Sequence, residues 1–260
     1  MATAPLDRFR LDGKTVAITG ASSGFGHHFA GVLATAGARV VLGARRVEKI
    51  EARVAELRGA GAQALGMALD VLDRASLARF LDAAWHEFGS LDVLVNNAGI
   101  ESGPKTYATI DEEDWDAVLD TNLKSVWLGS KLYTERAASR KTGGNIVNIA
   151  SITAFRTIKG QFPYAVSKAA LIKATEVMAL EGAKFGIRVN ALAPGYILTD
   201  VSRVLLESPK SEAFEKGIPM RRYGQFDDLD GPLLLLASDA SKWMTGSTIV
   251  VDGGHICAEL

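Results

Sequence analysis

Short apolar runs alternate along this chain with longer amphipathic segments. Seven runs rich in Val, Ile and Leu lack polar alternation, as strands buried on both faces of a sheet do. They lie at Thr15–Ile18, Arg39–Leu42, Ala64–Ala68, Leu91–Val95, Asn145–Ile149, Ile187–Leu192 and Thr248–Val251. Segments with helical periodicity lie between them, at 26–36, 46–60, 73–88, 111–139, 163–185 and 226–236. The alternation predicts an α/β fold with a parallel sheet of about seven strands and helices on both faces.

No Pro- or Ser-rich linker and no repeat interrupts the alternation, so a single domain over residues 1–260 is predicted. The segment 198–224 departs from the pattern, because it carries Pro209 and Pro219 among scattered apolar residues. Long irregular segments within compact domains are often functional. We expect a substrate loop near 198–224, with a plain surface insertion as the alternative.

Composition excludes several classes of protein. The chain has 29 Lys plus Arg and 30 Asp plus Glu, a net charge of −1, which disfavours a nucleic-acid binder that works by bulk charge. A hydrophobic share of 48% excludes intrinsic disorder. No apolar stretch approaches the ~18 residues of a membrane span. Cys257 is the single cysteine, so a disulfide within the chain is impossible, and a reducing, cytoplasmic location is expected.

A glycine-rich turn follows the first predicted strand and leads into a helix. In open α/β sheets ligands bind beyond the carboxyl ends of the strands, and glycines with a helix N-terminus let backbone approach a diphosphate. The spacing here is Gly-x-x-x-Gly-x-Gly rather than the common dinucleotide fingerprint, so a tight turn without a ligand is the alternative. The predicted cofactor contacts in this turn are Gly20, Ser22, Ser23, Gly24, Phe25 and Gly26.

Two arginines follow the second predicted strand. An acidic residue near this place would bind an adenosine ribose, whereas an arginine accommodates a 2′-phosphate. The expected acidic position holds Ala44, followed by Arg45 and Arg46. Cations at a helix N-terminus oppose the helix dipole, and a bound phosphate offsets them. We therefore favour NADP(H) over NAD(H). The alternative is that the two arginines face solvent at the start of a helix and bind no phosphate.

Polar and small residues also follow other predicted strands. Asp70 can accept a hydrogen bond from an adenine amino group or cap the next helix, and Asn side chains can tie neighbouring backbone together. A Pro-Gly turn after the sixth strand can support a flat ring, with Thr199 bonding an amide or phosphate. The further predicted cofactor contacts are Asp70, Val71, Asn97, Ala98, Gly99, Pro194, Gly195, Ile197 and Thr199.

A possible reactive group is formed by Ser151, at the end of the fifth strand, with Tyr164 and Lys168. Pro163 suits the first turn of a helix, so Tyr164 and Lys168 project from one helical face. A nearby cation lowers the pKa of a phenol and makes it able to exchange a proton with an alcohol or carbonyl oxygen. A Tyr–Lys pair alone is weak evidence for a catalytic site, because similar pairs occur by chance on many helices.

Asn122 adds a fourth polar residue. The stripe Trp115, Val118, Leu119, Asn122 and Val126 steps by three or four residues, which places Asn122 on an apolar helix face. A buried asparagine must find hydrogen-bond partners. It is either part of the reactive group or a structural tie between helix turns.

Together these motifs resemble the single-domain branch of the short-chain dehydrogenase/reductase family that carries an Asn-Ser-Tyr-Lys tetrad. The resemblance extends from Gly13 to about Gly254. Its marks are Thr19-Gly20-x-x-x-Gly24-x-Gly26, Asn96-Asn97-Ala98-Gly99, Asn122, Ser151, Tyr164-x-x-x-Lys168, Pro194-Gly195 and Val251-Asp252-Gly253-Gly254. One departure is Ser23, where some NADP-dependent members carry a basic residue. That departure keeps both cofactors open.

The resemblance implies a Rossmann-like, doubly wound fold. It implies Tyr164 as the acid/base, Lys168 as the residue that bonds the nicotinamide ribose and tunes Tyr164, and Ser151 as the residue that positions the substrate oxygen. It further implies that Asn122 holds a water in a proton relay. It also implies a homotetramer, with helices 111–139 and 163–185 at one interface and the C-terminal segment at another.

The remaining candidate residues give weaker evidence of a functional site. His27 and His28 are adjacent on a helix and point about 100° apart, so they cannot chelate together. His255 and Cys257 are too few for a structural zinc, and no metal site is predicted. Arg156, Lys159 and Arg203 can meet an anionic group or simply face solvent. The expected substrate walls are Glu101, Ser102, Thr153, Phe155, Phe162, Tyr196, Val204, Leu205, Phe214 and Ile218.

The leading hypothesis is an oxidoreductase that transfers a hydride between NADP(H) and a carbonyl or secondary alcohol. A small-molecule partner is expected, and neither nucleic acid nor membrane is. The alternatives are an NAD-dependent dehydrogenase of a polyol, sugar or hydroxy acid, and a non-catalytic dinucleotide-binding sensor.

Overall fold

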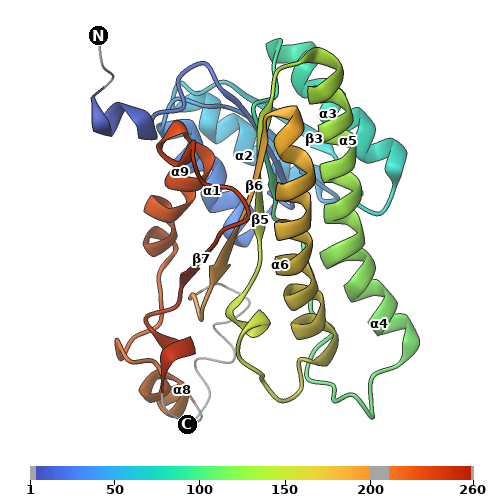
Figure 1. Ribbon diagram of the computed structural model, residues 1–260, viewed down its shortest axis with the longest axis vertical. Helices are drawn as coiled ribbons and strands as arrows, with labels where there is room; N and C mark the ends of the chain where they lie inside the picture. Colours follow the sequence, from blue (N-terminus) through green and yellow to red (C-terminus); the bar gives the residue numbers. More distant parts are fainter. Residues whose placement is uncertain (1–3, 199–210, 259–260) are drawn as a thin grey trace.

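The computed structural model describes residues 4–198 and 211–258, and its centre is a parallel sheet of seven strands (Figure 1). The strand order is β3-β2-β1-β4-β5-β6-β7. The strands are β1 (Thr15–Thr19), β2 (Arg39–Ala44), β3 (Ala64–Ala68), β4 (Val93–Asn96), β5 (Gly144–Ile149), β6 (Ile187–Pro194) and β7 (Thr248–Val251). The predicted Rossmann-like fold is confirmed.

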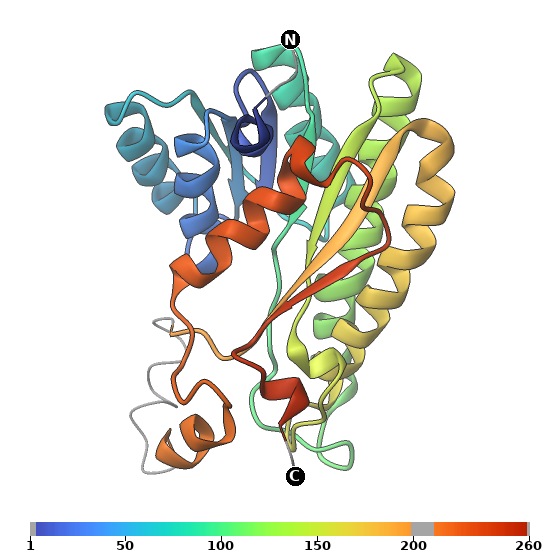
Figure 2. The same cartoon turned by 60° about the vertical axis from the view of Figure 1, so that its left-hand side comes forward.

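Helices cover both faces of this sheet (Figures 1 and 2). The helices are α1 (Gly24–Thr35), α2 (Val47–Gly59), α3 (Arg74–Phe88), α4 (Glu112–Leu119), α5 (Ser125–Arg140), α6 (Phe162–Gly182), α8 (Ser211–Gly217) and α9 (Asp230–Ala237). Phe29 of α1, Ile50 of α2 and Leu233 of α9 belong to one buried core. Phe80 of α3 and Tyr133 of α5 belong to another core. Apolar burial on both faces explains why the strand sequences do not alternate.

The predicted helix 111–139 is not a uniform α-helix. A π-helical turn, Asp120–Lys124, separates α4 from α5. The predicted helix 226–236 likewise begins with a 3₁₀ turn, Phe226–Leu229, before α9. Hydrophobic periodicity does not reveal these local changes, because a single π or 3₁₀ turn is too short to alter the repeat of apolar residues. The π turn matters for function, since it contains Asn122.

The strand order reverses at β1, which pairs in parallel with β2 on one side and with β4 on the other. In doubly wound sheets a ligand crevice opens at this switch point, beyond the carboxyl ends of the strands. A ligand is therefore expected to contact the segments that follow β1, β2 and β4. Among the described residues, no helix combines the length and apolarity needed to cross a membrane.

Candidate active site

The turn after β1 is shaped by close backbone contacts. Gly20 has a φ of +71°, and a Cβ there would lie 2.8 Å from the Cα of Ala98. A Cβ on Gly26 would lie 2.5 Å from Nδ2 of Asn97 and 2.6 Å from the carbonyl oxygen of Gly20. Helix α1 begins at Gly24, earlier than the predicted residue 26, so the last two glycines of the motif lie in its first turn. This leaves free N–H groups at the crevice, as a diphosphate requires.

Asn97 and Thr19 lock this turn to the end of β4. The Asn97 side chain donates hydrogen bonds to the carbonyl oxygens of Thr19 (2.9 Å) and Gly20 (3.1 Å). The Thr19 hydroxyl accepts from the backbone N–H groups of Asn97 and Ala98, each at 3.1 Å. The two loops therefore form one rigid unit. Thr19 was missed as a site residue, although a polar residue at the end of a buried strand was an available signal.

The two arginines after β2 have different surroundings. Arg46 donates to the hydroxyl of Ser22 at 2.9 Å and to that of Ser23 at 2.7 Å. A hydroxyl has no opposite charge, so these bonds orient Arg46 without neutralising it, and the argument that a phosphate would offset its charge still applies. Arg45 is exposed and makes no hydrogen bond within residues 4–198 and 211–258, so its guanidinium is the freer of the two to contact a phosphate.

A cavity of 680 Å³ joins these loops. Eleven of the predicted cofactor contacts line it: Gly20, Ser22, Ser23, Phe25, Arg45, Arg46, Asp70, Val71, Asn97, Ala98 and Gly99. Its shape and its glycine cradle fit a dinucleotide. Asp70 is exposed in this cavity, and its carboxylate accepts from the Leu72 N–H at 3.0 Å, whereas Asp73 caps α3. The helix-cap alternative for Asp70 is therefore wrong.

The Pro-Gly turn after β6 does not line the 680 Å³ cavity. Pro194 ends β6, and a Cβ on Gly195 would lie 2.7 Å from the Cα of Asp252, so packing against the end of β7 already requires this glycine. Ile197 lines a separate cavity of 130 Å³. Thr199 lies outside the described residues. The structure thus does not bring Pro194, Gly195 or Ile197 into the lining of the cavity beside β1.

Asn122 ties three segments together. Its Oδ1 accepts from the Ile100 N–H at 2.8 Å, and its Nδ2 donates to the Ile100 carbonyl at 2.9 Å and to the Ser167 hydroxyl at 3.2 Å. The alternative of a tie between turns of its own helix is wrong, because these partners lie after β4 and on α6. Ile100 and Ser167 were not among the predicted site residues, and their apolar or small side chains offered no signal.

Ser151, Tyr164 and Lys168 come together at the carboxyl ends of β4 and β5. Ser151 lies two residues beyond β5 and is hydrogen-bonded to Tyr164. Lys168 Nζ lies 5.5 Å from the centroid of the Tyr164 ring and donates to the Ile149 carbonyl at 2.8 Å. A Cβ on Gly99 would lie 3.3 Å from Oδ1 of Asn122 and 3.7 Å from Lys168 Nζ. We call Asn122, Ser151, Tyr164 and Lys168 the reactive cluster.

The predicted lowering of the Tyr164 pKa by Lys168 is wrong for this structure. Burial raises the pKa of Tyr164 above its ordinary value, the nearby Glu101 carboxylate raises it further, and the hydrogen bond with Ser151 opposes both effects. Burial also lowers the pKa of Lys168 to about 8, against the opposing effect of Glu101. Tyr164 is therefore protonated at neutral pH. In this state it can donate a proton to a carbonyl oxygen.

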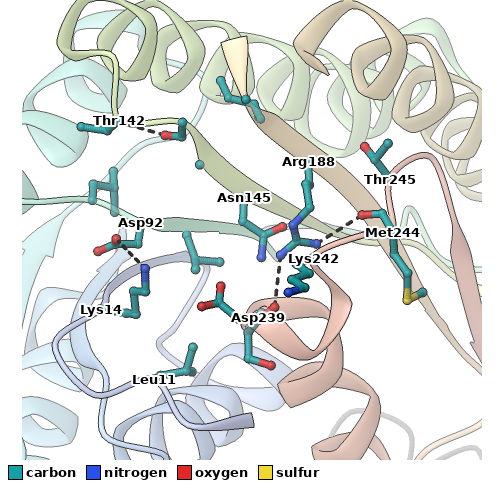
Figure 3. A pocket seen from close by; sticks show the side chains of 18 of the residues that line it. Leu11, Lys14, Asp92, Thr142, Asn145, Arg188, Asp239, Lys242, Met244 and Thr245 are labelled. Atoms are coloured by element: carbon teal, nitrogen blue, oxygen red, sulfur yellow. Dashed lines mark hydrogen bonds and ion pairs between the residues drawn. The ribbon is translucent and has the colours of Figure 1, made fainter. Parts of the chain in front are cut away.

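Another cavity, of 580 Å³, lies at the opposite, amino-terminal edge of the sheet (Figure 3). Two of its cations are paired within the protein. Arg188 donates to the carbonyl oxygens of Ser238 (3.2 Å) and Met244 (3.3 Å), and Lys14 lies 3.5 Å from Asp92. None of the predicted site residues within the described ranges lines this cavity.

Comparisons with known proteins agree with this geometry. A family model described as enoyl-(acyl carrier protein) reductase matches residues 20–255. The chain is 37% identical over 247 residues to 3-oxoacyl-[acyl-carrier-protein] reductase FabG of Thermotoga maritima, covering 95% of this chain and 99% of the relative. It is 36% identical over 248 residues to D-threitol dehydrogenase of Mycolicibacterium smegmatis, covering 95% and 94%.

A solved structure of gluconate 5-dehydrogenase from Burkholderia cenocepacia J2315, in complex with NADP and tartrate, superimposes with a TM-score of 0.93. It is 35% identical and covers 98% of this chain and 100% of its own. The chain belongs to the short-chain dehydrogenase/reductase family. It is thus an NAD(P)-dependent oxidoreductase, as the motifs predicted.

The predicted substrate wall of this dehydrogenase/reductase is only partly assembled. Tyr196 and Phe214 pack with buried Ile218 and Tyr223 beside the C-terminal segment. Phe155 and Phe162 are largely exposed, at 50% and 39%. Arg156 is half-buried rather than solvent-facing, because it donates to the His255 carbonyl at 2.6 Å. Arg203, Val204 and Leu205 lie outside the described residues.

Proposed function

We propose that the protein is an NADP(H)-dependent carbonyl reductase or alcohol dehydrogenase in which Tyr164 exchanges a proton with the substrate oxygen. The observation that carries this proposal is the meeting of Tyr164, Ser151 and Lys168 beside Gly99, at the inner end of the dinucleotide-sized cavity. When bound, NADP(H) supplies or accepts the hydride. Each remaining function in the reaction falls to a side chain of this chain.

The proton moves at the hydroxyl of Tyr164. Because its pKa is raised, the phenol holds its proton until a substrate oxygen that gains negative charge accepts it. Ser151 bonds the same oxygen and keeps it in line. Lys168, held by the Ile149 carbonyl, provides positive charge behind the phenol and a donor for the cofactor ribose. Both side-chain N–H groups of Asn122 are engaged, which leaves only an acceptor position for the proposed relay water.

The decisive test of the reaction class is a panel of carbonyl compounds and secondary alcohols, followed by nicotinamide absorbance with NADPH, NADH, NADP⁺ and NAD⁺. Oxidoreduction of at least one panel member, with loss in the Tyr164→Phe variant, supports the proposal. Tight dinucleotide binding without turnover of any member would favour the alternative of a non-catalytic sensor.

Cofactor choice depends on Arg45. The Arg45→Ala variant is expected to raise the Kd for NADPH by about 10-fold or more, since a charge-assisted contact to phosphate contributes roughly 1.5–3 kcal/mol. The Kd for NADH should stay within about twofold, because NADH has no 2′-phosphate. Titration by fluorescence measures both constants. Lys184→Ala removes an equal charge far from the cavity and serves as the control.

If Arg45→Ala affects both cofactors equally, or if the wild type prefers NADH, the NAD-linked alternative is favoured. That alternative, a dehydrogenase of a polyol, sugar or hydroxy acid, has support in the names of two relatives, D-threitol dehydrogenase and 2-dehydro-3-deoxy-D-gluconate 5-dehydrogenase.

The proposal includes a homotetramer. Helices α5 and α6 lie side by side and carry large apolar side chains that are exposed in the single chain: Trp127 at 50%, Val177 at 46% and Leu180 at 81%. Exposed apolar patches of this kind mark protein interfaces.

Leu180→Asp is expected to convert a tetramer into a dimer, because a buried, unpaired charge is costly. Analytical ultracentrifugation measures the mass, with Lys49→Ala on the other face as the control. A monomeric wild type, or an unchanged tetramer in the variant, contradicts this interface.

We also propose a cytoplasmic location. Its support is the single cysteine, Cys257, which is exposed and free. Exposed thiols persist in reducing compartments.

A further inference from the structure

A closed circuit of contacts surrounds the substrate side of Tyr164. Ser151 is hydrogen-bonded to Tyr164, and its Oγ accepts from the Thr153 N–H at 3.2 Å. Three residues on, the N–H of Arg156 bonds the Ile152 carbonyl at 2.9 Å. The Arg156 side chain then reaches the carbonyl of His255, near the C-terminus (2.6 Å).

The circuit closes through Tyr196 and Glu101. The Tyr196 ring lies 5.5 Å from the ring of His255, and the Glu101 carboxylate interacts electrostatically with Tyr196, Tyr164 and Lys168. Segments after β4, β5, β6 and β7 are thus linked to one another, and Ser151 and Glu101 connect them to Tyr164. Figure 2 shows the C-terminal segment, in red, beside the turn that follows β5. A substrate carbonyl that reaches Tyr164 lies inside this circuit.

Two polar groups in the circuit have no partner that would explain them. Thr153 is only 8% exposed, yet its hydroxyl makes no hydrogen bond. His255 is 7% exposed, and its Nδ1 likewise has none. A buried polar atom without a partner costs roughly 1–3 kcal/mol. A polar atom without a partner beside a reactive residue can be satisfied by a ligand that supplies the missing bond, and a threonine hydroxyl reorients by rotation about one bond.

Glu101 is the only acidic residue of the circuit. It follows Ile100, whose backbone Asn122 holds on both sides, so its position beside the reactive cluster is determined by that clamp. Its carboxylate makes no hydrogen bond within the described ranges. Glu101 is exposed in the single chain, although the atoms around its carboxylate are close enough to raise its pKa. A carboxylate beside a substrate site attracts hydroxyl donors and repels anions.

We propose that Glu101 and Thr153 form a polar subsite that selects neutral, polyhydroxylated substrates, whose hydroxyl groups lie on the carbons next to the reacting carbonyl. This inference rests on the proposed function and names its substrate class. Glu101 accepts a hydrogen bond from one hydroxyl, and Thr153, two residues from Ser151, bonds another. His255 and Tyr196 form the wall behind them.

Four-carbon ketones test this subsite with a constant number of carbon atoms. We would compare 2-butanone, acetoin and erythrulose, which carry zero, one and three further hydroxyls, with the anion acetoacetate. The kcat/KM is expected to rise by about tenfold or more from 2-butanone to erythrulose, since one hydrogen bond to a buried group contributes about 1–1.5 kcal/mol. Acetoacetate should be the poorest substrate. A preference for 2-butanone over erythrulose would overturn the inference.

Two variants assign the selectivity. Thr153→Val should lower the erythrulose-to-butanone ratio of kcat/KM by about fivefold or more, a loss of roughly 1 kcal/mol. Glu101→Gln should lower the same ratio and raise the acetoacetate-to-butanone ratio by at least about fivefold, because the repelling charge is gone. Glu113→Gln, an exposed residue on α4, removes the same charge elsewhere and should leave both ratios unchanged.

The readout is a ratio, so a general loss of folded enzyme cancels, and thermal unfolding checks each variant. Ratios that stay constant in Glu101→Gln and Thr153→Val overturn the subsite while the proposed function stands. Failure of the wild type to reduce any carbonyl of the wider panel, with either cofactor, overturns the proposed function itself.

Discussion

Tyr164→Phe is expected to lower kcat for carbonyl reduction by about 10³-fold, in the middle of the 10²–10⁴-fold range typical of a positioned general acid. The variant loses the hydroxyl that holds the transferable proton. Its ring still packs beneath Lys168, whose Nζ lies 5.5 Å from the ring centroid, so the local structure should persist. Steady-state kinetics with the best panel substrate measures the loss.

NADPH binding by this variant should change by less than about threefold, under 1 kcal/mol, because the glycine cradle and Arg45 lie in other segments. The matched control is Tyr107→Phe, which removes a hydroxyl from a tyrosine that is 78% exposed and packs edge-on against Phe162. It should keep wild-type activity. Full activity in Tyr164→Phe would remove the acid/base function from this residue and, with it, the proposed mechanism.

The sequence predicted the sheet well, because a strand that is buried on both faces needs a continuous apolar run. It also placed the cofactor loops, since loops after neighbouring parallel strands must meet at one edge. Asn122 was recognised as a buried asparagine from the apolar stripe around it. Its partners could not be named, because Ile100 and Ser167 approach it only once the π turn and the strand end are folded.

Electrostatic properties were predicted less well. The hydrogen bonds that orient Arg46 were not predicted, because its partners Ser22 and Ser23 lie more than 20 residues earlier in the chain. For Tyr164 the sequence showed a cation four residues away but not the depth of burial. In the folded site the cost of charging the phenol on burial sets the direction of the Tyr164 pKa shift, and the nearby Glu101 carboxylate adds to it. Pairwise spacing contains no measure of burial.

Lys168 is expected to cost the folded protein stability, so that Lys168→Met is more stable than the wild type at pH 7. Burial lowers the pKa of Lys168 to about 8, and each pKa unit below the ordinary ~10.4 corresponds to about 1.4 kcal/mol, or roughly 3 kcal/mol in all. The variant also loses the hydrogen bond to the Ile149 carbonyl, which costs about 1 kcal/mol. The net gain should be about 2 kcal/mol in the free energy of unfolding, together with loss of activity.

The pH dependence of this gain separates the charge effect from simple repacking. Between the folded pKa of about 8 and the unfolded value near 10.4, the unfolded wild type binds more protons than the folded one, so wild-type stability rises with pH. Urea unfolding should therefore show the advantage of Lys168→Met to be constant below pH 7.5 or so. It should shrink by about 1.4 kcal/mol per pH unit above 8 and vanish near pH 9.5. Tyr164 stays protonated in both proteins over this range, because its pKa is raised.

Lys173→Met provides the matched control on the same helix. Lys173 is exposed and paired with Glu176, so its replacement should change stability by less than about 0.5 kcal/mol at every pH. A Lys168→Met variant that is less stable than the wild type at pH 7, or whose advantage does not change up to pH 9.5, would show that Lys168 is not held at an energetic cost. The expected result would instead mean that a buried lysine is retained for the reaction and against stability, since helix α6 could fill its place with an apolar side chain.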